Sequence, residues 1–203
     1  VVGLFTKNVI KRQEKQIIKM KIKESDKLVE IKNVSVGCDP ELFFRSKDSK
    51  DFVASFSIIK GDKNNPTVIS EKGHNIQCDN VMVEYGVPPS KTADEFVKNN
   101  MFVQNYLKEK IADPQGLELF IFPFAVFSDN ELKSDRAQVF GCDPDFDVWN
   151  GGRPNEVGRA GSNGRCAGGH IHVGYDKPNR VTSNYIVKAL DLFISTPLVL
   201  MEP

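Results

Sequence analysis

The sequence predicts an α+β fold: a mostly antiparallel sheet with helices packed on one face. After Asn33, short apolar runs alternate with segments rich in Gly, Pro, Asn and Asp, as strands separated by turns do. Two later segments instead carry apolar residues at helical spacing, one after Thr92 and one after Thr182. Strands followed by helices that pack on them indicate the α+β class.

Charge and composition narrow the partners of this 203-residue chain. Lys and Arg number 27 and Asp and Glu also number 27, so the formal net charge is zero. No overall field favours nucleic acid or an anionic membrane, and neither is expected as a partner. The four cysteines form no Cys-x-x-Cys pair, which fits a reducing, cytoplasmic compartment. The longest apolar runs, 117–127 and 189–201, are interrupted or too short to span a bilayer.

Two regions are expected along the chain. Residues 1–32 are rich in Lys and have only partial helical spacing, so they are interpreted as a basic extension without chemistry. A basic arm that binds nucleic acid or lipid is the alternative. Residues 33–203 are expected to form one domain.

The first half of that domain is expected to consist of strands. Within 80–87, alternation places Met82 and Glu84 on one face and Val83 and Tyr85 on the other. A turn is expected at Asp39 and Pro40. The candidate strands are 34–36, 42–44, 52–59, 67–70 and 80–87.

The second half adds helices. Thr92 and Glu95 form a capping-box pattern, so a helix is expected from there to Ile111, with its apolar stripe in the core. The run 117–127 reads as a buried strand that bends or lies at an edge, because Pro123 interrupts it. Residues 134–160 lack periodicity, as functional or disordered segments do; their aromatic residues favour an ordered one. The last helix is expected over 183–194, with Thr182 as its cap and Pro197 beyond its end.

The segment 168–174, Gly-Gly-His-Ile-His-Val-Gly, is the strongest candidate for a functional strand. A period of two puts His170 and His172 on one face and Ile171 and Val173 on the other. Flanking glycines leave that face uncrowded, as close approach of a ligand requires. Two ordinary half-exposed histidines are the alternative.

Acidic side chains in two other segments fit a divalent cation. Asp39 and Glu41 stand at i and i+2, on one face of an extended chain, and Glu84 points away from the apolar face of its strand. Carboxylate oxygen is the ligand that Mg²⁺ prefers. Arg159 and Arg165 lie on a Gly-rich segment before the histidine strand, where fixed cations suit phosphate or carboxylate groups.

Together these motifs resemble the glutamine synthetase and glutamate-cysteine ligase superfamily, most closely its phage-type carboxylate-amine ligase branch. Its acidic-x-Glu pair before aromatics matches residues 39–44, and its metal-binding Glu after an Asn is similar to residues 80–84. Its Gly-x-His-x-His strand resembles residues 168–172. The Gly-Cys-x-Pro-Asp-aromatic segment of the branch resembles residues 141–146.

The resemblance implies an ATP-dependent ligase that joins a small-molecule or peptide carboxylate to an amine through an acyl phosphate. ATP and Mg²⁺, or Mn²⁺, would be its cofactors, and an oligomer is compatible with it. Glu41 and Glu84 would be metal carboxylates, His170 the metal imidazole and Asp39 a weaker metal ligand. His172 would lie nearer the nucleotide phosphates. From their position shortly before the histidine strand, and not from the resemblance, Arg159 or Arg165 is expected to steady the transferred phosphoryl group or the substrate carboxylate, with Arg165 also contacting the nucleotide.

Two interpretations other than a ligase are kept open, the first because of a departure from the family pattern and the second because of the His-x-His pattern. Family members continue past the last helix into strands with an acidic-x-Arg motif, so residues 33–203 are expected to be a truncated domain. A non-catalytic structural or interaction module that retains the ligase fold is one alternative. A metal-dependent hydrolase or oxygenase is the other, although such proteins place an acid a few residues after the second His.

Overall fold

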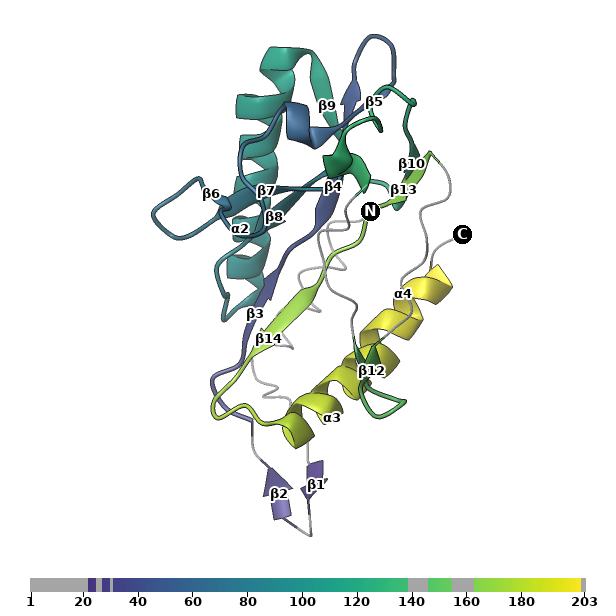
Figure 1. Cartoon of the computed structure of the whole chain (residues 1–203). Coiled ribbons are helices and arrows are strands. Elements are labelled where there is room, and N and C mark those ends of the chain that lie inside the picture. Colours follow the sequence, from purple (N-terminus) through teal and green to yellow (C-terminus); the bar gives the residue numbers. More distant parts are fainter. Residues whose placement is uncertain (1–21, 25–26, 30, 139–145, 155–162, 202–203) are drawn as a thin grey trace. The chain divides into compact units, whose positions relative to one another are not determined.

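The structure, a computed structural model, describes residues 22–24, 27–29, 31–138, 146–154 and 163–201 (Figure 1). It divides into two compact units. A terminal unit comprises Val1–Val34 and Tyr175–Pro203, and a central unit comprises Ser35–Gly174. Every predicted site residue that the structure describes belongs to the central unit.

The main sheet of the central unit is antiparallel throughout. Its strand order is β5-β4-β8-β7-β6, and β9 also pairs with β4. With the helices described below, this sheet confirms the α+β class. The strands are β4 (Glu41–Ser46), β5 (Phe52–Val53), β6 (Thr67–Val68), β7 (Asn75–Asp79), β8 (Met82–Gly86) and β9 (Leu117–Phe120).

Three further strand pairs complete the central unit, and all are antiparallel. β3 (Ser35–Cys38) pairs with β14 (Ile171–Gly174). β10 (Phe124–Val126) pairs with β13 (Gly164–Cys166), and β11 (Phe146–Asp147) pairs with β12 (Arg153–Pro154).

The segment between β3 and β4 is not the chain reversal that the Asp-Pro pattern predicts. Val87 N–H donates to Cys38 O and Tyr85 N–H donates to Pro40 O, both at 3.3 Å. The hydrogen-bond ladder with β8 therefore continues on both sides of Pro40. Pro40 itself has no N–H to donate, so one hydrogen bond of the ladder is absent there. As a result, β3 and β4 present one long line of side chains.

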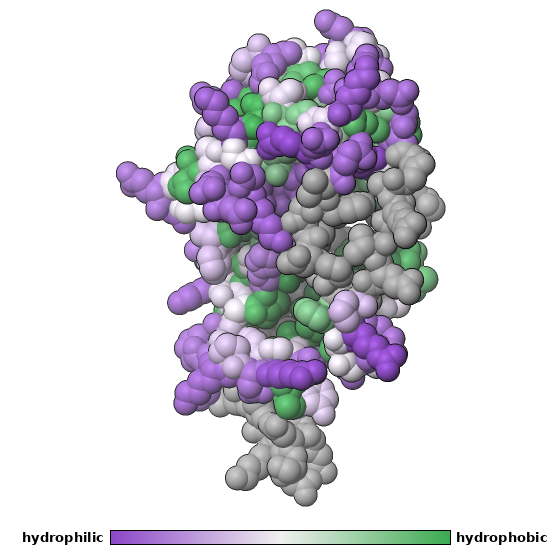
Figure 2. Space-filling model, in the orientation of Figure 1, coloured by the Kyte–Doolittle hydropathy of each residue, from purple (hydrophilic) through white to green (hydrophobic). Residues whose placement is uncertain are grey.

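The two faces of the main sheet are buried by different partners. Leu42, Phe44 and Val83 pack with Val103 and Leu107 of the following helical segment. The opposite face holds a second cluster of buried residues, and Glu41 lies on that face because side chains alternate along β4. The buried members of this second cluster are Phe43, Ala54, Val81, Met82, Ala125, Phe127, Leu132 and Ala137. On the view in Figure 2, hydrophilic residues predominate over much of the described surface, with smaller hydrophobic areas between them.

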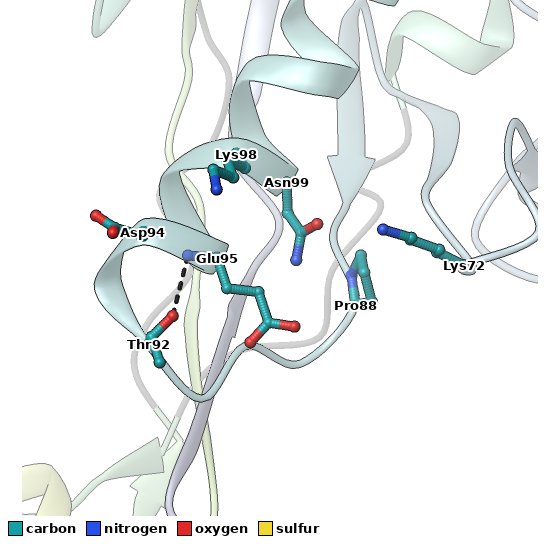
Figure 3. A pocket seen from close by; sticks show the side chains of 7 residues that line it. All are labelled: Lys72, Pro88, Thr92, Asp94, Glu95, Lys98 and Asn99. Atoms are coloured by element: carbon teal, nitrogen blue, oxygen red, sulfur yellow. Dashed lines mark hydrogen bonds between the residues drawn. The ribbon is translucent and has the colours of Figure 1, made fainter.

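Helix α2 (Ala93–Tyr106) begins with the predicted cap. Thr92 accepts a hydrogen bond from Glu95 N–H at 3.2 Å (Figure 3), while the Glu95 carboxylate accepts one from Lys91 N–H. The chain continues through a π-helical turn, Leu107–Ala112, so the helix expected to reach Ile111 is confirmed. Its apolar stripe is buried only in part, because Val97 and Phe102 remain 52% and 43% exposed.

The predicted strands 52–59 and 117–127 are both shorter than expected. The segment 52–59 forms only β5 and a 3₁₀ turn, Ser55–Ser57. The run 117–127 is split into β9 and β10 around Pro123, as its proline predicts, but it is not a buried strand: Ile121 is 69% exposed. In the irregular segment 134–160, the described parts are a 3₁₀ turn, Asp135–Gln138, and the β11–β12 hairpin. Phe146 and Trp149 are exposed there, contrary to the burial their size predicts.

The terminal unit contains a short hairpin and a long helix. β1 (Ile22–Glu24) pairs with β2 (Lys27–Val29). The helix comprises α3 (Arg180–Leu190), a π-helical turn (Asp191–Ser195) and α4 (Thr196–Met201).

Both predicted ends of this helix are wrong. Asn179, not Thr182, is the cap, since its side chain accepts from Thr182 N–H at 3.0 Å. The helix also runs through Pro197, which follows the π-helical turn. Arg180–Met201 is thus 22 residues long, and an 18-residue window of it has a mean hydropathy of 1.3, enough to cross a membrane by length and composition. The prediction that the run 189–201 is interrupted or too short to span a bilayer considered only the second half of this helix. Core helices of soluble proteins share these properties, so they do not by themselves place this helix in a membrane.

Candidate metal centre

Three carboxylates meet on the face of the main sheet opposite α2. Glu41 on β4 pairs directly with Glu84 on β8, and Glu84 pairs with Gln77 on β7. Asp79 lies two residues after Gln77 and therefore on the same face. One carboxylate oxygen from each of Glu41, Asp79 and Glu84 lies within 4.8 Å of the other two. These three residues are called the carboxylate group below.

A second set of ligand atoms follows along the same line of side chains. His172 on β14 pairs with Gly37 on β3, and Asp39 N–H donates to His170 O at 3.3 Å. Asp39 Oδ1 lies 3.2 Å from His170 Nδ1, and Asp39 Oδ2 lies 3.1 Å from His172 Nε2. Asp39, His170 and His172 are called the histidine group. The predicted common face of the two imidazoles is confirmed.

Backbone and side-chain donors hold the carboxylates in place. Gly168 N–H donates to Glu41 Oε2 and His170 N–H donates to Asp39 Oδ1, both at 2.6 Å. The Gln77 amide donates to Glu84 Oε2 at 2.9 Å. Gly169 has a φ of +153°, and a Cβ there would lie 2.8 Å from Pro40 Cα. The glycines before the first histidine therefore let the backbone of this segment approach residues 39–41 closely.

The carboxylate group is electrostatically costly without a cation. Burial raises the pKa of Glu41, and it raises the pKa of Glu84 to about 7, with further increases from Asp39, Asp79 and Glu41. Asp79 is only 8% exposed. Carboxylates gathered in a buried place favour either a bound proton or a bound divalent cation. Oxygen-only donors fit Mg²⁺ or Mn²⁺, so these residues suit the metal that the resemblance implies.

Metal binding at this group is expected to release a proton near neutral pH. With a folded-state pKa of about 7, roughly three-quarters of Glu84 is protonated at pH 6.5. A metal takes the ionised form, so its affinity should rise with pH through 7. The folding stability of the metal-free protein should depend on pH in the opposite direction. The raised pKa of Glu84 stabilises the fold below pH 4.5, and this contribution is lost as the pH rises through 7.

Titration calorimetry of Mg²⁺ at pH 6.5, in buffers of different ionisation enthalpy, measures this proton release. The wild-type protein should release about three-quarters of a proton per ion at pH 6.5 and much less at pH 8. Glu84→Gln removes the titrating group, so equal proton release in that variant would assign the proton to another residue.

Of the two predicted arginines, the structure describes only Arg165. Arg165 is 6% exposed, and its guanidinium donates to Asn80 Oδ1 at 3.2 Å and to Ala137 O at 3.0 Å. These contacts give it a structural role beside the 3₁₀ turn Asp135–Gln138, and its catalytic and nucleotide-binding roles stay predictions. Arg159 lies outside the described residues, as do residues 141–145 of the Gly-Cys segment.

Sequence reasoning missed Asp79 and Gln77, because residues 75–79 were not recognised as a strand. The signal was the turn between β7 and β8. Asn80 has a φ of +54°, and Asp79 pairs with Met82 across a two-residue turn. Asn is one of the few residues that adopt this conformation readily. A hairpin placed there would have put Asp79 on the face of Glu84.

His74, the third histidine, lies in a separate buried network. Its exposed fraction is 3%; Ser70 Oγ lies 2.6 Å from its Nδ1, and Asn99 Oδ1 lies 3.1 Å from its Nε2. Burial lowers its pKa, which keeps the imidazole neutral. Asn99 also lines a hollow of about 480 Å³ at the start of α2 (Figure 3). Charges of both signs surround this hollow, so it favours no one ligand charge. Its lining residues are Lys72, Pro88, Thr92, Asp94, Glu95, Lys98 and Asn99.

Comparison of the chain with protein-family models, with curated proteins and with solved structures finds no match in any of the three. The family resemblance therefore stays a prediction that rests on the motifs.

Proposed function

We propose that this chain carries the metal-binding part of an ATP- and Mg²⁺-dependent carboxylate-amine ligase with a glutamine synthetase-like sheet. The observation that carries the proposal is the direct pairing of Glu41 with Glu84, with Asp79 beside them. Motifs more than 40 residues apart in sequence thus meet at one place, as the resemblance requires. The adjoining histidine group extends the same line of ligands.

In this proposal, the role of the chain's own residues is to bind the metal ion and to hold it in a fixed position. Glu41, Asp79 and Glu84 would hold Mg²⁺, fixed by the donors from Gly168 and Gln77. When bound, Mg²⁺ offsets the charge of the phosphate groups of ATP during phosphoryl transfer. The substrate carboxylate oxygen would attack the γ-phosphorus and ADP would leave. The amine nitrogen would then attack the acyl carbon, and phosphate and a proton would leave.

The experiment is calorimetric titration of the whole chain with a non-hydrolysable ATP analogue. Binding is expected with Mg²⁺, not with EDTA, and not in an Asp79→Asn, Glu84→Gln double variant. If the wild-type protein bound Mg²⁺ but no nucleotide, the ligase proposal would fail. ATP consumption with sets of carboxylates and amines would then identify the substrates, which are expected to be small molecules or peptides.

One observation favours a second candidate, a metal-dependent hydrolase or oxygenase. Such sites combine two imidazoles with one carboxylate. Asp176 follows His172 by four residues in sequence, but its Oδ2 accepts from the Asn33 amide at 2.7 Å. The carboxylate that lies within 3.2 Å of both imidazoles is that of Asp39, between β3 and β4. Metal binding without nucleotide binding would support this candidate.

A further inference from the structure

We propose that the histidine group is a second and chemically different metal site, which takes a borderline transition ion such as Zn²⁺ or Fe²⁺. The carboxylate group would hold the hard cation. This inference rests on the proposal that the centre binds divalent metal, and it assigns His172 to a metal instead of to nucleotide phosphates.

The spacing of the donor atoms fits such an ion. Ligands about 2.1 Å from a tetrahedral ion stand about 3.4 Å from one another. Asp39 Oδ1 lies 3.2 Å from His170 Nδ1, and Asp39 Oδ2 lies 3.1 Å from His172 Nε2. One ligand atom from each of the three residues lies within 4.8 Å of the other two. The ring centroids of the two imidazoles are 6.3 Å apart, so a bound ion would require side-chain rotations that bring their nitrogens closer together.

The kind of donor separates the two groups. The carboxylate group offers only oxygen, the preference of Mg²⁺, Ca²⁺ and Mn²⁺. The histidine group offers two imidazole nitrogens and one carboxylate, a set that suits Zn²⁺ and Fe²⁺. Mg²⁺ gains little from imidazole nitrogen and retains its water. The two groups should therefore select different ions from the same solution.

The surroundings of the histidine group favour an open site with room for a further ligand. The side chains of His170 and His172 are 46% and 61% exposed, whereas that of Asp39 is 18% exposed. Gly37 faces His172 across the strand pair and adds no side chain above it. The N–H of His170 donates to Asp39 Oδ1 and so fixes the carboxylate. In metal sites, hydrogen bonds from neighbouring groups commonly orient the ligands in this way. Three protein ligands and an exposed side are typical of catalytic metal sites.

Cobalt spectroscopy of the whole chain tests this assignment without an assay of activity. Co²⁺ is expected to bind with visible d–d absorption bands, which Zn²⁺ abolishes and millimolar Mg²⁺ leaves unchanged. In His172→Gln, Co²⁺ affinity should fall by at least about a hundredfold, because a direct ligand matters at least as much as its supporting contacts. The matched control is the Asp79→Asn, Glu84→Gln variant, which should keep the bands.

Three outcomes would overturn the inference: no cobalt bands in the wild-type protein, bands that survive in His172→Gln, or bands that Mg²⁺ displaces as readily as Zn²⁺ does. Because His172 is largely exposed, its replacement should leave the fold intact, and circular dichroism checks this. Shifts of the imidazole ¹⁵N signals on Zn²⁺ addition to the wild-type protein give a second readout. Cobalt bands without Mg²⁺-dependent nucleotide binding would refute the ligase proposal alone; nucleotide binding without cobalt bands would refute this inference alone.

Discussion

Changing Asp79 to Asn and Glu84 to Gln together is expected to abolish the stabilisation of the protein by Mg²⁺. At a Mg²⁺ concentration about a hundred times the dissociation constant, binding contributes about 2.7 kcal/mol to the wild-type protein. For a unit of this size, that corresponds to a rise in Tm of roughly 10 °C. The variant loses two of the three oxygen ligands, so its Tm should be the same with Mg²⁺ and with EDTA.

The same change should raise the Tm of the metal-free protein, because it removes repulsion among partly buried carboxylates. Asp48→Asn with Glu109→Gln is the matched control, since it neutralises two exposed acids that do not belong to the group. This control should keep the full Mg²⁺ effect in differential scanning fluorimetry. A variant at Asp79 and Glu84 that kept the effect would show that Mg²⁺ binds elsewhere.

Phe43→Ala is expected to cost about 3–5 kcal/mol of unfolding free energy. Phe43 is fully buried on the sheet face that carries Glu41, and its ring packs 5.7 Å from that of Phe52 and 5.8 Å from that of Phe127. Truncation would leave a cavity beside Glu41 on the same face of the sheet, so Mg²⁺ affinity should fall as well. Guanidinium denaturation measures the first effect.

Phe146→Ala is the control for the core, because Phe146 is 69% exposed. Its cost should stay within about 0.5 kcal/mol, as for other surface substitutions. Equal effects of the two substitutions would contradict the assignment of Phe43 to the core.

Local patterns predicted the parts of the centre that lie within single segments. The period of two placed His170 and His172 on one face, and the alternation in β8 placed Glu84 opposite Val83 and Tyr85. The start of α2 followed from Thr92 and Glu95, since capping depends only on neighbouring residues. These features are set by backbone geometry over a few residues.

Features that depend on pairing between distant strands could not be predicted in this way. No local pattern places Asp39 against residues 131 and 133 positions later, or sets Glu41 opposite Glu84. Asp79 was missed because its strand was missed. The cap at Asn179 and the continuation through Pro197 were misjudged for another reason: several residues near each end carry similar signals, and the surrounding structure selects among them.

Manganese binding, followed by electron paramagnetic resonance, tests most directly whether the carboxylate group holds a divalent cation. The signal of free Mn²⁺ should fall when the wild-type protein is added and return when excess Mg²⁺ displaces the ion. His172→Gln should retain this Mg²⁺-displaceable binding, and the Asp79→Asn, Glu84→Gln variant should lose it. An undiminished free Mn²⁺ signal with folded wild-type protein would contradict a metal site at Glu41, Asp79 and Glu84.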